Sequence, residues 1–252
     1  MISKASHRRK NRTFKAASVA LACSVSATAS HAQEGWDYTG LFYLWGAGLG
    51  GETTTGQDVD VGFSDILENL DFGIMGTLEA RNGRWSIFGD AIYLNVASDD
   101  DATAGPGIPV SVAAEVEGFV FTTGVGYDFA QTNSSRLNGF AGLRYLDMDT
   151  EVNLAVAGGS SRVNDKFSNW DGIIGLRGQS ALSPDWDLLY YADVGTGDSD
   201  LTWQVALAMD YKFDAWTLTF GYRHLDWSGL NDSATLEDLN FSGPFVGAKF
   251  NF

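Results

Sequence analysis

The last fourteen residues of the chain, 239–252, read LNFSGPFVGAKFNF and constrain the fold more than any other stretch. Apolar side chains stand at every second position, at Val246, Ala248, Phe250 and Phe252, with small or polar residues between them. This period of two predicts a β-strand with one apolar and one polar face. An exposed edge strand of this kind is an aggregation hazard in a soluble sheet. In a membrane-spanning barrel it is expected, because lipid covers the apolar face.

The first 32 residues predict a secretory signal peptide. Six Lys or Arg precede an uncharged run over 16–29, and a small-residue cleavage motif ends at Ala32. The single cysteine, Cys23, lies in that run, so cleavage would leave residues 33–252 with no disulfide framework. Lipid attachment at Cys23 is the alternative, although Ala20 stands where the lipoprotein pattern has Leu.

The charge of the remaining chain excludes several classes of partner. Residues 33–252 hold 10 basic and 32 acidic side chains, a net charge of −22. Nucleic acid and anionic membrane surfaces both attract basic proteins, so neither is an expected partner. No stretch approaches the roughly 18 apolar residues of a transmembrane helix. A membrane protein of this sequence would therefore have to be a closed barrel.

Nine further segments alternate as the last one does. With it they predict an all-β, transmembrane, antiparallel up-and-down β-barrel of about ten strands, with eight or twelve as alternatives. Short connections alternate with longer ones over 50–71, 97–111 and 228–238, as periplasmic turns alternate with outer loops. Asn82-Gly83 predicts one of the tight turns. The nine segments are 36–49, 72–81, 85–96, 112–129, 137–156, 162–179, 186–194, 201–213 and 216–227.

Aromatic spacing gives a second indication of a membrane barrel. Three segments carry same-face aromatic residues eight positions apart, which is about 26 Å along a strand. With a tilt of about 40° this projects to about 20 Å, close to the roughly 25 Å band between aromatic girdles. A soluble β-sandwich is the competing interpretation, but it leaves the predicted signal peptide and Phe252 unexplained. The pairs are Trp85/Tyr93, Phe119/Tyr127 and Trp203/Tyr211.

The connection over 50–71 contains a helical signal. Ser64 is a candidate N-cap, Asp65 would lie near the positive end of the helix, and Ile66, Leu67 and Leu70 would share one face. Two interpretations stay open: a helix that folds over or into the barrel mouth, and a surface loop with one helical turn.

Charged residues lie opposite the apolar faces and predict a charged lumen. Isolated buried charges are costly, so these side chains should pair across the lumen or contact water. An ion-paired, closed interior and a narrow water-filled conduit both fit a barrel slightly larger than the eight-stranded, filled size. The predicted lumen charges are Glu79, Arg81, Asp90, Arg144, Asp171, Arg177, Asp193, Asp210, Lys212, Arg223 and Lys249.

Metal, cofactor and enzymatic functions receive little support. The acidic clusters Asp99-Asp100-Asp101 and Asp198-Ser199-Asp200 offer oxygen ligands without a complete metal-loop motif, so we expect no metal or other cofactor. His224 is the only histidine after residue 32, and Asp226 and Ser228 share its face near the outer rim. These three could form a catalytic set. The spacing of known barrel hydrolases is absent, however, and no catalytic residue is predicted.

Several motifs resemble a family of small proteobacterial outer-membrane β-barrel proteins. Gly172 stands where that family has a proline, and Gly195-Thr196-Gly197 replaces a Gly-Gly-Phe-Gly segment. The resemblance covers most of the chain and implies an outer-membrane barrel without a particular activity. Its motifs are Tyr43-Leu44-Trp45, Phe63 to Leu70, Trp170-Asp171, Gly175-Leu176-Arg177-Gly178, Asp193-Val194-Gly195, Thr202-Trp203-Gln204 and Gly221-Tyr222-Arg223.

The closing strand resembles the C-terminal recognition signal of bacterial outer-membrane proteins. That resemblance implies that Val246, Ala248, Phe250 and Phe252 bind the barrel-assembly machinery. The expected product is a monomer in the outer membrane of a Gram-negative bacterium, surrounded by lipid and lipopolysaccharide. Its expected function is a structural or surface role with an ion-paired lumen. The alternatives are a narrow, weakly cation-selective small-solute channel and, behind it, an outer-membrane hydrolase that uses His224.

Overall fold

The alternating segments form strands throughout the computed structural model, which describes residues 35–104, 108–156, 159–231 and 233–252. The predicted signal peptide and its predicted cleavage after Ala32 fall outside these residues. One short helix, α1 (Phe63–Glu68), is the exception to the all-β pattern in the described chain. The strands are β1 (Asp37–Trp45), β2 (Gly48–Thr53), β3 (Asp58–Val61), β4 (Leu70–Asn82), β5 (Trp85–Ala104), β6 (Ile108–Gln131), β7 (Ser135–Val156), β8 (Gly159–Ala181), β9 (Trp186–Gly197), β10 (Ser199–Lys212), β11 (Thr217–Leu230) and β12 (Leu236–Asn251).

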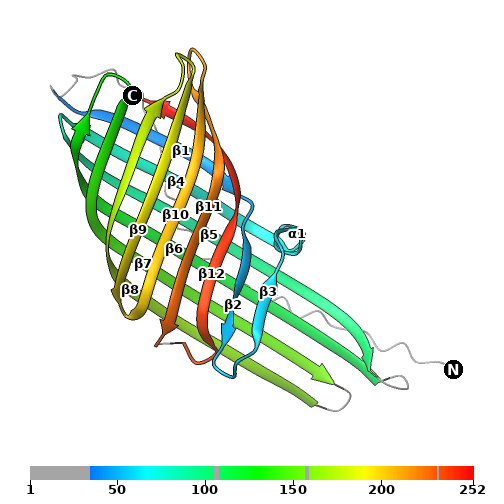
Figure 1. Ribbon diagram of the computed structural model, residues 1–252. Helices are drawn as coiled ribbons and strands as arrows, with labels where there is room; N and C mark the ends of the chain where they lie inside the picture. The colour runs from blue at the N-terminus through cyan, green and yellow to red at the C-terminus, as the bar shows by residue number, and fades with distance from the viewer. Residues whose placement is uncertain (1–34, 105–107, 157–158, 232) are drawn as a thin grey trace. The chain divides into compact units, whose positions relative to one another are not determined.

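The strands close into an antiparallel barrel of ten, which confirms the predicted fold class and strand number. β1 pairs with β4 on one side, and neighbours in sequence then pair in turn from β4 to β12 (Figure 1). The ring closes where β12 pairs with β1, from Thr39 opposite Asn251 to Trp45 opposite Phe245. β2 continues along the first half of β12, and β3 folds back on β2, so both lie outside the ten-strand count.

Short connections gather at one end of the barrel, which we call the turn end. Residues 83–84, 132–134, 182–185 and 213–216 connect strands there, and the backbones of Tyr38 and Phe252 pair at the same end. Asn82 pairs with Trp85, so the central residues of the first turn are Gly83 and Arg84. The turn lies one residue later than Asn82-Gly83 predicts, because Gly83 takes its first central position with a φ of 56°.

At the opposite end, the loop end, β5 and β6 continue as strands through most of the loop predicted over 97–111, whereas β7 ends at Val156 as the sequence predicted. Residues 97–111 belong mostly to β5 and β6, which pair as far as Ala104 and Ile108. β7 and β8 pair as far as Val156 and Gly159, and these four strands extend beyond the rest of the barrel (Figure 1). Pairing continues because each strand satisfies the backbone N–H and C=O groups of its neighbour. Residues 99–107, which read DDDATAGPG, carry no apolar alternation that would predict this pairing.

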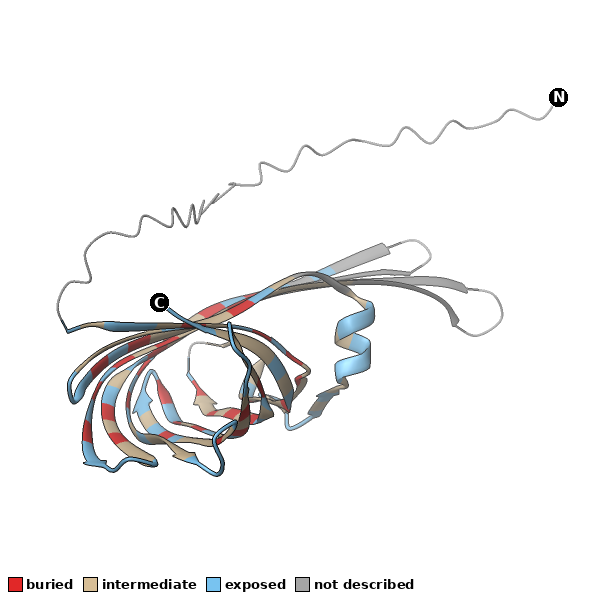
Figure 2. Ribbon diagram, turned by 90° about the horizontal axis from the view of Figure 1, so that it is seen from above, coloured by how far each residue is buried: buried red, intermediate tan, exposed pale blue. Residues whose placement is uncertain are grey.

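The wall of the barrel is interrupted beside α1. The β1–β4 ladder ends at Phe42 opposite Gly76, and β2 then follows β12 rather than β4. Helix α1 connects β3 to β4 at the side of the ring, not across its mouth (Figure 2). The N-cap is Gly62, without a side-chain capping bond, so the prediction of Ser64 as the cap was wrong. Asp65 lies in the first turn, as predicted.

The outer and inner faces of the wall differ sharply. Many outward side chains are apolar and exposed, for example Leu44, Leu78 and Ile174, whereas Asp149 and Lys166 form an exposed ion pair on the extended parts of β7 and β8. Buried residues alternate with them along the strands of the ring (Figure 2). Contacts between strands, such as that of the Tyr43 hydroxyl with Asp90, place these side chains inside the barrel. Within the described residues, no helix has the length and hydropathy of a transmembrane segment.

Candidate functional site

The interior of the barrel is the candidate site, because the inward side chains meet there in three successive levels. Charged and amide side chains occupy the turn end, ion-paired arginines occupy the middle, and apolar side chains fill the loop end. Strand register sets each height: inward residues of β7 are Asn138 at the turn end, Arg144 in the middle, and Leu146 and Met148 towards the loop end.

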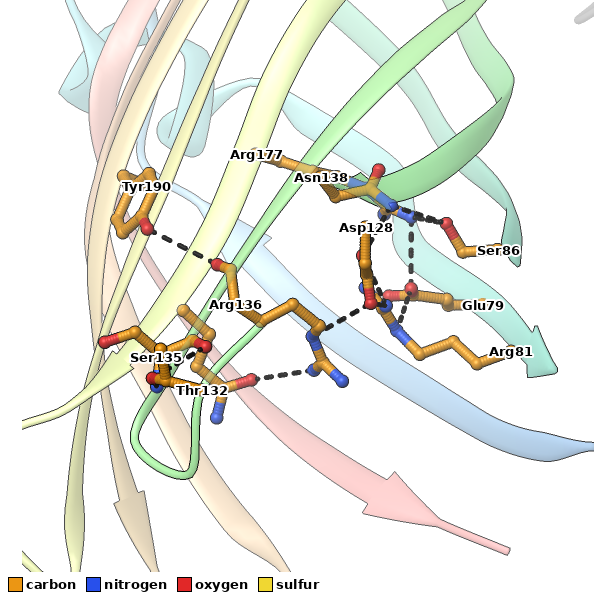
Figure 3. A network of polar contacts seen from close by, with 11 residues as sticks. Glu79, Arg81, Ser86, Asp128, Thr132, Ser135, Arg136, Asn138, Arg177 and Tyr190 are labelled. Atoms are coloured by element: carbon orange, nitrogen blue, oxygen red, sulfur yellow. Dashed lines mark hydrogen bonds and ion pairs between the residues drawn. The ribbon is translucent and has the colours of Figure 1, made fainter. Parts of the chain in front are cut away.

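Arg81 lies at the centre of the turn-end level. Its Nε atom is 2.6 Å from Glu79, and its Nη1 donates to both oxygens of Asp128 at 3.2 and 3.1 Å (Figure 3). Arg136 approaches the same Asp128 carboxylate at 3.9 Å. Asp128 is buried, and these two cations together with the amide of Asn138 at 2.7 Å compensate for its desolvation.

Arg177 connects the same level to its neighbours. It donates to Glu79 at 3.0 Å and to Ser86 at 2.9 Å, and its Nε donates to Asn138 at 3.3 Å (Figure 3). Its guanidinium also lies 4.1 Å from the centre of the Phe88 ring. Gly126 makes this arrangement possible, because a Cβ there would lie 2.1 Å from Oδ1 of Asn138.

Two lysines complete the turn end around an open cavity. Lys212 contacts Asp187 at 2.8 Å, and Lys249 pairs with Asp210. The cavity has a volume of about 790 Å³ and is lined by the ion-paired residues of this level. Lys212 keeps 41% of its side chain exposed, so at least this pair contacts water.

Arg144 occupies the middle of the lumen and is completely buried. Its Nη2 lies 2.5 Å from Asp193, and its Nη1 donates to Thr202 at 2.8 Å. The hydroxyl of Tyr191 donates to the same carboxylate at 2.5 Å. Short charge-assisted hydrogen bonds of this kind are the strongest in proteins. The guanidinium also lies 5.8 Å from the Trp227 ring, which belongs to the apolar level beyond.

Arg223 forms a second cluster beside Arg144. It contacts Asp90 at 3.0 Å, the hydroxyl of Tyr43 at 2.8 Å and the amide oxygen of Gln204 at 2.8 Å. Tyr43 donates in turn to Asp90 at 2.9 Å. Gln204 also accepts from Arg144 at 3.5 Å, so one amide oxygen links the two arginines.

The loop end of the lumen is packed with apolar side chains. Leu146, Leu225, Trp227 and Leu239 are 0–1% exposed. Among the described side chains, this half is therefore filled by apolar packing apart from a small apolar pocket at the wall. The members of the cluster are Tyr43, Trp45, Ala47, Met75, Ile92, Val120, Leu146, Met148, Phe167, Leu225, Trp227, Leu230 and Leu239.

The structure brings ten of the eleven predicted lumen charges into ion pairs with one another or with Asp128 and Asp187. The eleventh, Asp171, is buried and accepts hydrogen bonds from the backbone and hydroxyl of Ser199. Sequence reasoning missed Asp128, Asp187 and Arg136. The alternation of inward and outward residues places all three on the inner face, so the signal was present.

Asp165 is a further residue that the sequence did not single out. It lies on β8 beyond Trp170 and accepts hydrogen bonds from Ser233, Ala234 and Thr235 in the connection between β11 and β12. Burial alone would raise the pKa of Asp165, but these hydrogen bonds outweigh it and hold the pKa below its usual value. The ionised carboxylate therefore fixes this loop against β8.

His224 lies on the outer face of β11, opposite the inward Arg223 and Leu225. His224 stacks on Trp203 with ring centres 4.6 Å apart and lies 3.9 Å from Asp226. Ser228 donates to Asp226 at 3.4 Å, and no hydrogen bond joins it to His224 in the described structure. Asp198 caps the backbone N–H of Trp170. The side chains of 99–101 fall outside the described residues, and no metal-binding group of three appears among those described.

Comparisons with known proteins give structural likeness only. No protein-family model matches the chain, and no curated protein matches its sequence. Among solved structures, the outer membrane protease OmpT from Escherichia coli is 13% identical with a TM-score of 0.49, over 88% of this chain and 98% of that one. The translocator domain of autotransporter NalP from Neisseria meningitidis is 16% identical, TM-score 0.40, over 88% and 90%. Ail of Yersinia pestis is 14% identical, TM-score 0.36, over 87% and 99%. None of these likenesses carries an activity to this chain.

Proposed function

We propose that this chain is an integral outer-membrane β-barrel with a closed, non-conducting lumen and a structural or surface role. The complete burial of Arg144 in the middle of the lumen carries the proposal. A conduit would need water around that guanidinium. Instead Asp193, Thr202 and the Trp227 ring surround it, and the apolar level lies beyond.

The outer face supports a place in a membrane. Outward positions on β4 between Ile74 and Ala80, and on β8 between Gly172 and Leu176, carry no charge. Aromatic side chains border this apolar band. Tyr145 and Trp170 contact each other towards the loop end, and Trp85 and Tyr127 do so at the turn end. An apolar band between two aromatic girdles is the surface that a bilayer requires of a barrel.

The closing strand supports export to the outer membrane. Val246 and Phe250 are exposed on the outer face of β12, and the exposed Phe252 that follows this strand stacks on Tyr38 with ring centres 6.1 Å apart. We propose that these residues, with Ala248, are bound by the barrel-assembly machinery before the ring closes. Deletion of Phe252 should reduce the amount of folded protein in the outer membrane, measured by heat-dependent gel mobility.

Conductance tests the closed lumen. The refolded protein, 33–252, should insert into planar bilayers without producing channel steps. Steady, cation-selective steps would instead support a narrow small-solute channel, in which the middle ion pairs separate and the 790 Å³ turn-end cavity becomes a vestibule. Heat-dependent mobility of the same sample shows whether the protein was folded.

A further inference from the structure

A gap in the barrel wall opens next to α1. The β1–β4 ladder ends at Phe42 and Gly76, while the chain beyond Trp45 leaves β4 and follows β12. The first residues of β4 therefore lack the β1 neighbour that closes the rest of the wall. The exposed side chains around the gap are apolar: Leu44 on β1 and Ile74 on β4.

Helix α1 covers this gap with its apolar residues. Phe63 lies against Gly46, where a Cβ would come 3.4 Å from the Phe63 ring. Gly46 thus lets the helix approach the break between β1 and β2. Phe63, Ile66 and Leu67 all line a pocket of about 140 Å³ that reaches from the helix to the apolar level of the lumen.

The pocket has no group that would hold a polar ligand. Its lining contains no charged side chain and, among side chains, one polar atom, the indole N–H of Trp45. That N–H donates to the carbonyl oxygen of Gly243 at 3.1 Å. The inner lining consists of aliphatic side chains, two thioethers and the Phe241 ring, among them Met75, Val120 and Met148. Methionine adapts its shape readily and contacts aromatic rings favourably.

Gly118 borders the open space of this pocket. It lies on the inner face of β6 between Leu94 and Met148, and a Cβ built there would meet no atom within 4 Å. An apolar cavity of about 150 Å³ is large enough to bind benzene and stays free of water. The pocket beneath α1 has nearly that volume.

We propose that this pocket binds one benzene-sized hydrocarbon, taken from the membrane through the gap that α1 covers. The gap faces the apolar band, so a hydrocarbon dissolved in the bilayer reaches it without crossing water. Phe63 and Leu67 are 41% and 55% exposed, so the cover is held by few contacts and can shift. Binding here is independent of conduction, because the pocket ends at the packed apolar level.

Methionine NMR provides the test, with benzene as the probe. Residues 33–252 contain three methionines: Met75 and Met148 line the pocket, whereas Met209 lies outside it. In refolded protein carrying ¹³C-methyl methionine in nanodiscs, added benzene should shift the Met75 and Met148 signals saturably. Met209 reports benzene dissolved in lipid, and its shift should grow without saturation.

Two glycine variants decide the outcome. Gly118→Leu should fill the pocket and weaken the saturable response at least tenfold, with Gly118→Ala intermediate. Gly172→Leu, on the outer face of β8 where a Cβ would meet only the Thr196 carbonyl oxygen at 3.8 Å, should leave it unchanged. A response of Met75 and Met148 that parallels Met209, or that survives in folded Gly118→Leu, overturns the proposal. Nuclear Overhauser contacts from lipid chains to both methyls, without a benzene response, would also overturn it.

Discussion

The two halves of the lumen are filled by different kinds of side chain, charged and ion-paired at the turn end and apolar at the loop end. At the turn end, Arg81 and Arg177 share the Glu79 carboxylate, and Lys212 pairs with Asp187, around an open cavity of about 790 Å³. At the loop end, side chains such as Leu225 and Trp227 belong to one apolar cluster and are 0% exposed. Ion pairs near water contribute little to the free energy of unfolding, so losing one partner destabilises the fold only slightly. A buried ion pair next to the apolar half is different, because losing one partner leaves the other charge buried and uncompensated. The barrier to solute passage should therefore lie in the middle and at the loop end.

The largest effect is expected where the two halves meet. Asp193→Ala would leave Arg144 buried and unpaired and should lower the free energy of unfolding by about 3–5 kcal/mol. Urea unfolding in lipid vesicles, followed by tryptophan fluorescence, measures it. The double variant Arg144→Met/Asp193→Leu removes both charges, and its free energy of unfolding should fall clearly less than that of Asp193→Ala. Equal losses in the two variants would contradict a desolvated ion pair.

Alanine substitutions at two inward glycines of β6, one in each half of the lumen, test how tightly each half is packed. Gly126→Ala should destabilise the barrel by about 1–3 kcal/mol, because its Cβ would clash with buried Asn138. Gly118→Ala should be neutral or stabilise by a few tenths of a kcal/mol, since its Cβ meets open space and Gly weakens strands. The same urea titration compares them. A loss at Gly118 as large as at Gly126 would mean that no pocket exists.

A second arginine on β7 provides the turn-end counterpart of Arg144. Arg136 is one-third exposed and lies 3.9 Å from Asp128, which keeps Arg81 and Asn138 as partners. Arg136→Met should therefore lower the free energy of unfolding by less than about 1 kcal/mol, and by less still in high salt, which screens the ion pair. A loss near that of Asp193→Ala would show that the turn end is as dry as the middle.

The effect on the barrel as a whole should be smallest at Asp165, because losing its carboxylate should loosen only the connection between β11 and β12. Because its folded pKa lies below the unfolded value of about 3.9, its contribution is present above pH 4 and is lost as pH falls through the lower folded pKa. Asp165→Asn should speed amide exchange at Ala234 and Thr235 roughly tenfold at pH 7, about 1.4 kcal/mol. Exchange in the barrel strands should not change. An unaltered exchange rate at these two amides would show that the Asp165 carboxylate does not hold this loop.

The sequence predicted the strands better than the contents of the barrel. Alternation gives the face of each residue, so the ten-strand count and the inward position of Arg144 followed from it. Alternation does not give the position of a residue along the barrel axis. The pairing of Arg144 with Asp193, 49 residues away on β9, could therefore not be predicted. Around Tyr43 and Trp45 both faces of β1 are apolar, and nothing local shows which face is inside. The dry loop end and the pocket under α1 depend on strand stagger and on the break at Gly46.

Single-channel conductance tests the central claim most directly: a lumen closed at its dry half. Wild-type 33–252, shown to be folded by heat-dependent mobility, should give no steps in a planar bilayer. The variant Arg144→Ala/Trp227→Ala removes a cation and a ring from the middle and from the level beyond, and should produce small or flickering steps if it folds. Silent wild-type protein supports the closed lumen. Steady, cation-selective steps from the wild type would contradict it.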